Sequence, residues 1–168
     1  LAQVSTFGSG QSTHCQDVKG RGEQIGIDAA VTWLGEQEWS NGNVGIMGKS
    51  YAGTTAWEGA QFGNPHLKTI VPISGSIGVQ QMFYRNGSAE SRSMVYDLLY
   101  QGATADLTTD DMRICSDDII GPASPITTWA GAEVGGDRWS DYWEERFHLP
   151  DVLANYEGSV YLVWGMQD

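Results

Sequence analysis

The spacing of apolar residues predicts a helix near the start of the chain. In residues 23–38, Ile27, Ala30, Val31 and Leu34 recur at the interval that places side chains on one helical face. The pattern is typical of a helix that buries one stripe against a core.

Strand-like runs and helical segments alternate around this helix. Residues 4–12 indicate a strand end that leads into a glycine-rich loop, and residues 39–42 indicate a turn. We expect a buried strand at 44–47, a helix at 51–62 and a short strand at 69–73. This alternation predicts a parallel sheet covered by helices, which is the α/β class.

The pattern changes after residue 80 and returns to strand character only at Val160. Residues 88–101 read as a helix, 104–120 as an acidic loop, and 139–147 as an aromatic-rich helical segment. The acidic loop lacks the glycine and final glutamate of a calcium loop, so we expect no metal site there.

We therefore divide the chain into a core and an insertion. Residues 1–79 and 158–168 are assigned to one α/β core, and residues 80–157 to a mostly helical insertion. Ligands bind at the carboxyl ends of the strands in such sheets. An insertion between two strands is therefore expected to act as a cap over the site.

A tight strand-to-helix bend at Ser50 is the strongest candidate for chemistry. The strand ends in Gly48, Ser50 follows at the apex, and the small residues Ala52 and Gly53 open the next helix. Small neighbours allow the strand and helix to approach closely enough to force the apical residue into a strained conformation. This geometry exposes a serine hydroxyl as a nucleophile.

A phosphate-binding loop is an alternative for the same residues. Gly48-Lys49-Ser50 ends like G-x-x-x-x-G-K-[ST], but Asn43 stands where that motif requires glycine. Val44–Met47 also resembles a strand rather than a loop of free amides. A bend that contains serine by chance is the structural alternative.

Composition narrows the possible partners. The chain of 168 residues has 21 acidic and 9 basic residues and a formal charge of -12, which disfavours nucleic acid and anionic membranes. No apolar run approaches the roughly 20 residues that a membrane-spanning helix needs. We expect no cofactor, and leave a homo-oligomer open.

The cysteines bear on the cellular compartment of the protein, and the ends of the chain bear on whether it is part of a longer protein. Cys15 and Cys115 form no C-x-x-C pair, and we expect free thiols rather than a disulfide or metal site. The chain begins at Leu1 and ends at Asp168 directly after an apolar run. We expect an internal segment of a longer protein; its compartment is open, with the cytoplasm favoured.

Four collinear segments resemble the Xaa-Pro dipeptidyl-peptidases and their relatives, cocaine esterase and α-amino-acid ester hydrolases. In chain order, these segments are Phe7-Gly-Ser-Gly-Gln-Ser12, the stretch from Trp33-Leu34 through Trp39-Ser-Asn-Gly42 to Val44-Gly45, Gly48-Lys-Ser-Tyr-Ala-Gly53, and Val160-Tyr-Leu-Val-Trp-Gly-Met-Gln-Asp168. They are similar to the family's G-T-G-x-S loop, its W-L…W-[SA]-N-G-x-V-[GA] stretch, its G-x-S-Y-x-G bend and its V-L-x-V-H-G-x-x-D strand. Ser9 and Trp164 depart from these patterns, standing where threonine and histidine are usual.

The resemblance implies an α/β-hydrolase with a serine, aspartate and histidine triad. It implies that Ser50 is the nucleophile, that Asp168 is the triad acid, and that the Tyr51 backbone amide is an oxyanion donor. The second oxyanion donor of the family lies upstream of this segment.

The general base is expected outside the chain. His14, His66 and His148 all precede Asp168, whereas the family's histidine follows its acid. We interpret the three as surface or structural residues, and we expect this segment alone to be inactive.

The resemblance favours an exopeptidase that releases N-terminal Xaa-Pro dipeptides through an acyl-enzyme. Tyr84, Trp139 and Trp143 are candidates for lining the proline slot. Four carboxylates are candidates for binding a substrate amine: Glu90, Asp97, Asp141 and Glu144. The alternatives are an ester or amide hydrolase of the same family, a P-loop nucleotide-binding protein, and a non-catalytic hydrolase-like binding module.

Overall fold

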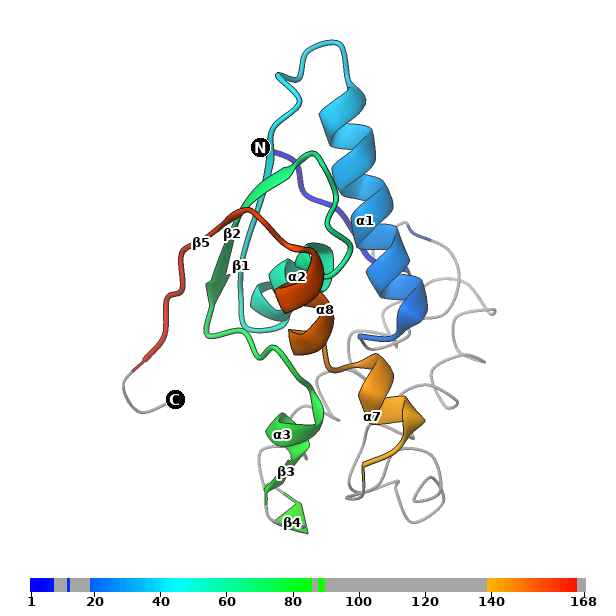
Figure 1. The fold of residues 1–168 in the computed structure, drawn as a ribbon, viewed down its shortest axis with the longest axis vertical. Helices are drawn as coiled ribbons and strands as arrows, with labels where there is room; N and C mark the ends of the chain where they lie inside the picture. Colours follow the sequence, from blue (N-terminus) through cyan, green and yellow to red (C-terminus); the bar gives the residue numbers. More distant parts are fainter. Residues whose placement is uncertain (8–11, 13–18, 86–87, 90–138, 166–168) are drawn as a thin grey trace. The chain divides into compact units, whose positions relative to one another are not determined.

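The computed structural model describes residues 1–7, 12, 19–85, 88–89 and 139–165 (Figure 1). Several residues from the sequence analysis lie outside these ranges: Ser9, His14, Cys15, Glu90, Asp97, Cys115 and Asp168. The helix expected at 88–101 and the acidic loop at 104–120 also fall almost wholly outside them.

The chain forms two compact units. One comprises Leu1–Glu23 and Val79–Arg146, and the other comprises Gln24–Gly78 and Phe147–Asp168. The predicted core boundary at residue 79 lies beside the second break between the units, at Gly78 and Val79. The assignment of 80–157 to a cap stays a prediction, although the helix over Leu149–Asn155 belongs to the second unit.

The second unit contains a three-stranded parallel sheet. Its strands are β1 (Val44–Lys49), β2 (Leu67–Ile73) and β5 (Ser159–Val160), in the order β1-β2-β5. β1 and β2 pair from Val44 with Leu67 to Lys49 with Ile73, and β5 pairs with β2 at Thr69 and Ile70. The parallel sheet that the alternation of elements predicted is therefore confirmed.

Helices cover this sheet. α1 (Arg21–Glu36) begins at the edge of the first unit, α2 (Tyr51–Ala60) follows β1 directly, and α8 (Leu149–Asn155) precedes β5. α2 packs on both β1 and β2, and Figure 1 shows α2 and α8 next to each other. α1, β1, α2 and β2 are confirmed within a few residues of their predicted bounds.

The core of this unit lies between the sheet and the helices. Its buried residues come from α1, α2, β2 and α8: Val31, Ala56, Ala60, Leu67, Ile70 and Val152. Val152 explains why α8 belongs here, because its side chain is part of this cluster. The segment Leu149-Pro150-Asp151 carries a local signal for the start of α8, since proline is favoured in a first helical turn.

The structure describes fewer residues of the first unit than of the second. The first unit holds α3 (Gln80–Phe83), the antiparallel pair β3 (Tyr84–Arg85) and β4 (Ser88–Ala89), and α7 (Asp141–Glu145). Val79, Tyr84 and Trp143 form its buried cluster. The strand end expected from residue 4 is not found, since Leu1–Thr6 have no regular secondary structure.

Candidate active site

Ser50 occupies the bend between β1 and α2. Its backbone has φ 57° and ψ −120°, and the residue is exposed. A positive φ is uncommon for a residue with a Cβ, and such a conformation costs about 1–3 kcal/mol. This is the strained apical conformation that the small residues around Ser50 predicted.

Two close backbone approaches explain the small residues at the bend. A Cβ added to Gly48 would lie 2.3 Å from the Ala52 carbonyl oxygen, and one added to Gly53 would lie 2.8 Å from the Ile73 oxygen. Both distances are far below van der Waals contact. Glycine at these positions therefore lets β1, α2 and the end of β2 meet around Ser50.

Hydrogen bonds hold the bend on both sides. The Ser50 amide donates to the Ile73 carbonyl at 2.9 Å, and the Gly53 and Thr54 amides donate to the Ser50 carbonyl at 2.9 and 3.0 Å. Tyr51 is the first residue of α2, so its amide precedes the helix's own hydrogen-bond ladder. It lies at the positive end of the helix macrodipole.

The same edge of the sheet receives the chain after β5. The Val163 amide donates to the Pro72 carbonyl at 3.1 Å, and the Ser74 amide donates to the Val163 carbonyl at 2.8 Å. The segment that leads to Asp168 therefore runs beside β2 as far as its carboxyl end. Since the strands are parallel, this is also the edge at which β1 delivers Ser50.

The structure contradicts the phosphate-loop alternative. β1 is a strand from Val44 to Lys49 and pairs with β2 in parallel, with one shift of register between Val44 and Gly45. A phosphate-binding loop needs this segment to curl so that its amides point at the ligand. Lys49 is instead an exposed residue at the end of a strand.

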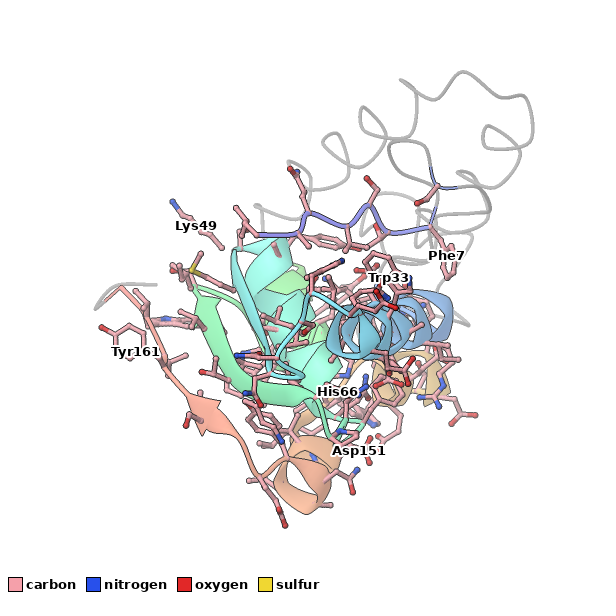
Figure 2. All side chains as sticks on the ribbon, turned by 90° about the horizontal axis from the view of Figure 1, so that it is seen from above. Phe7, Trp33, Lys49, His66, Asp151 and Tyr161 are labelled. Carbon is pink, nitrogen blue, oxygen red and sulfur yellow. The ribbon has the colours of Figure 1, made fainter. Side chains whose placement is uncertain are left out.

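His66 lies at the opposite edge of the sheet from Ser50. It directly precedes β2, its carbonyl accepts from the Val44 amide at 2.8 Å, and its Nδ1 lies 2.9 Å from the Gly42 carbonyl. Its ring contacts Gly35 on α1, and Figure 2 shows it beside that helix. The structural interpretation of His66 fits this position.

His148 is fully buried in the second unit. Its Nε2 lies 3.7 Å from Oε1 of Glu58 on α2, and neither side chain is exposed. The pair joins the residue before α8 to the helix that follows Ser50. A histidine enclosed in this way fits the structural role that we expected for it.

The candidate substrate-binding aromatics lie in the first unit. Tyr84 and Trp143 are buried and meet edge to face, with ring centroids 6.1 Å apart. Trp139 is exposed, and its Nε1 donates to the Glu144 carboxylate at 2.5 Å. The packing of Tyr84 with Trp143 is thus a structural contact, and the role of all three in substrate binding stays a prediction.

The segment after β2 is a part of the site that the sequence patterns did not predict. Ser74 has a positive φ of 46°, and the Gly75 carbonyl accepts from Trp57 Nε1 at 3.0 Å. The run Ser74-Gly75-Ser76 after a strand was a local signal for a special backbone conformation, but its partners are distant in sequence.

No metal-binding group of three or more His, Cys, Asp or Glu residues occurs in the part of the chain that the structure describes. In the same residues, no helix is both long and apolar enough to span a membrane.

Known proteins match this chain in sequence and in fold. The sequence model of the X-Pro dipeptidyl-peptidase (S15) family matches residues 1–168. A Bacillus anthracis protein, named provisionally as an Xaa-Pro dipeptidyl-peptidase, is 28% identical over 97% of this chain. Cocaine esterase from a Rhodococcus species is 36% identical over 41% of the chain.

A solved structure shares the fold. A CocE/NonD family hydrolase from Staphylococcus aureus superposes with a TM-score of 0.70 and 24% identity over 92% of this chain. The chain spans 28% of the length of the Bacillus anthracis relative and 25% of the Staphylococcus aureus chain. With its parallel sheet, flanking helices and bend at Ser50, the chain belongs to the X-Pro dipeptidyl-peptidase (S15) family of α/β-hydrolases.

Proposed function

We propose that this chain carries the nucleophile of a serine exopeptidase that releases N-terminal Xaa-Pro dipeptides. The observation that carries the proposal is the exposed Ser50 in its strained bend between β1 and α2. A backbone of this kind persists only where neighbouring contacts hold it, and such conformations cluster at active sites. Family membership supports hydrolysis as the reaction class.

The proposed reaction proceeds in two steps through an acyl-enzyme. Ser50 Oγ attacks the carbonyl carbon of the proline residue, and a histidine base outside residues 1–168 takes its proton. The base returns the proton to the leaving amine as the scissile C–N bond breaks. Water then hydrolyses the ester on Ser50 and releases the dipeptide.

The remaining roles follow from position on the chain. The Tyr51 amide at the start of α2 is the proposed donor to the developing oxyanion, where one donor is worth about 3–4 kcal/mol of transition-state stabilisation. Asp168 is the proposed acid that orients the histidine. Its support is that the segment before it runs to the same sheet edge as Ser50.

An ester or amide hydrolase of the same family is the second candidate. One observation favours it, namely the 36% identity to cocaine esterase over 70 residues. An ester reaction would use the same nucleophile and oxyanion donor, but would need no site for a free substrate amine. The substrate therefore decides between the two candidates.

The test uses the full-length protein that contains these residues. We expect a fluorophosphonate probe to label Ser50, and Ala-Pro-anilide to be cleaved faster than a butyrate ester. Ser50→Ala should abolish labelling and lower kcat on the order of 10⁴-fold or more, because the nucleophile is lost. Ser159→Ala, at an exposed serine of β5, is the matched control and should change neither.

Each other result identifies an alternative. If Ser50 is labelled but the butyrate ester is the preferred substrate, the result would overturn the peptidase proposal and support the esterase. An unlabelled Ser50 in a folded full-length protein would support the non-catalytic binding module and overturn the hydrolase proposal.

A further inference from the structure

Ile73, the last residue of β2, and the next two residues, Ser74 and Gly75, each form a hydrogen bond with a different part of the second unit. The Ile73 carbonyl accepts from the Ser50 amide at 2.9 Å, and the Ser74 amide donates to the Val163 carbonyl at 2.8 Å. The Gly75 carbonyl accepts from Trp57 Nε1 at 3.0 Å. This segment, Ile73–Gly75, therefore touches the bend, the chain after β5, and α2.

The segment is held in a strained and closely packed conformation. Ser74 has φ 46°, which is costly for a residue with a Cβ. A Cβ added to Gly75 would lie 2.3 Å from the Gly53 carbonyl carbon, so the two backbones are in direct contact. Neighbouring groups must supply the free energy that keeps Ser74 in this state.

Trp57 is the side chain that ties this segment to the helix after Ser50. It lies on α2, about 10 Å along the helix axis from the bend at 1.5 Å per residue. It is half-buried against the core cluster, and its single indole N–H is used on Gly75. The bond closes a ring that runs from Ser50 along α2 to Trp57, across to Gly75, and back through Ile73 to the Ser50 amide.

We propose that Trp57 is a positioning residue for Ser50 and for the strand segment that leads to Asp168. It acts through Gly75 and touches no reacting atom. By fixing the segment Ile73–Gly75, it sets the distance between Ser50 and the chain that leads to Asp168, which lie on either side of that segment. The inference rests on the proposed function, because it requires Ser50 to be the nucleophile.

The physical consequence is a loss of rate with little loss of binding. A displacement of about 1 Å at a reacting group costs on the order of 100-fold in rate. The loss of one neutral hydrogen bond should displace Ser50 by less than this and therefore lower the rate by a smaller factor. Substrate binding through other parts of the protein would remain. The expected signature is therefore a lower kcat at nearly constant KM.

The experiment compares Trp57→Phe with Trp33→Phe in the full-length protein. Trp57→Phe keeps an aromatic ring in the core but removes the donor to Gly75. Trp33→Phe makes the same change at an exposed tryptophan of α1. We expect kcat of Trp57→Phe to fall about tenfold, with KM and the fraction of sites labelled by fluorophosphonate within about twofold of wild type.

A second measurement does not depend on turnover. Amide hydrogen exchange at Ser50 and Ser74 should become faster in Trp57→Phe and stay unchanged in Trp33→Phe. An unchanged kcat in Trp57→Phe would overturn the inference. So would a fall in kcat that is matched by an equal fall in labelled sites, since that indicates partial unfolding.

Failure of the proposed function has a different signature. If wild-type Ser50 is not labelled and neither substrate turns over, both the function and the positioning role are overturned. If wild type is labelled and active but Trp57→Phe behaves like Trp33→Phe, only the positioning role is overturned.

Discussion

Ser50 shows how one residue can be held against its own conformational preference. Its φ of 57° is opposed by its Cβ, and the bond from its amide to Ile73 and the two bonds to its carbonyl retain it. Glycine would adopt this backbone with no Cβ penalty. Stability and the proposed catalysis therefore make opposite demands at this position.

Replacing Ser50 tests the strain directly. We expect Ser50→Gly to have a free energy of unfolding about 1 kcal/mol higher than Ser50→Ala, because only alanine retains the Cβ in the positive-φ region. Urea denaturation of both variants measures the difference.

Ser159 on β5 provides the control for that comparison. Ser159 lies in a strand, where glycine loses more conformational freedom on folding than alanine. Ser159→Gly should therefore be less stable than Ser159→Ala by about 0.5–1 kcal/mol. The same order of stability at both positions would contradict the strain at Ser50.

At the scale of elements, Asn64 joins α1 to the connection between α2 and β2. Its Nδ2 lies 2.7 Å from Asp28 Oδ1 and 2.8 Å from Thr32 Oγ1, both on α1. Its Oδ1 accepts from the His66 amide at 3.0 Å. A single buried amide thus holds the start of β2 against a helix that lies far away in the sequence.

Asn64→Ala should destabilise the second unit more than a typical surface substitution. We expect a loss of about 1–3 kcal/mol, because the His66 amide and the α1 acceptors lose their partner in a partly buried site. Thermal or urea unfolding gives the value.

Asn41 is a matched asparagine for this measurement. It is exposed, and its Oδ1 accepts only a local bond from the Asn43 amide at 3.0 Å. Asn41→Ala should change the free energy of unfolding by no more than about 0.5 kcal/mol. Equal losses at the two positions would rule out a special role for Asn64.

At the scale of the whole molecule, the described sheet is short and open to solvent along β5. Tyr161 and Trp164 are 68% and 47% exposed, and Figure 2 shows Tyr161 pointing away from the helices. Neither described histidine of the second unit stands at the carboxyl edge beside Ser50. His66 lies at the other edge, and His148 is enclosed with Glu58.

Residues 1–168 expressed alone should therefore show no turnover of Ala-Pro-anilide or butyrate ester. The full-length protein is the positive control, and circular dichroism of the isolated segment checks that it is folded. Turnover by the isolated segment that is lost in Ser50→Ala would contradict this prediction and would direct attention to His14, which lies outside the described residues.

Much of the core was predictable because its signals are local. The helical period of Ile27 and Val31 predicted α1, and the small residues around Ser50 predicted both the bend and its strain. α8 was missed because seven residues with one proline gave a weak period, and its place depends on a distant contact of Val152.

The sequence by itself determined α1, β1, α2 and β2 and the place where the backbone must bend at Ser50, since these depend on neighbouring residues and on the absence of a Cβ. Only the tertiary structure decided the strand order β1-β2-β5, the bond of Trp57 to Gly75 and the links made by Asn64. Those contacts join residues that are separated along the chain, so their formation depends on packing between elements rather than on a local pattern.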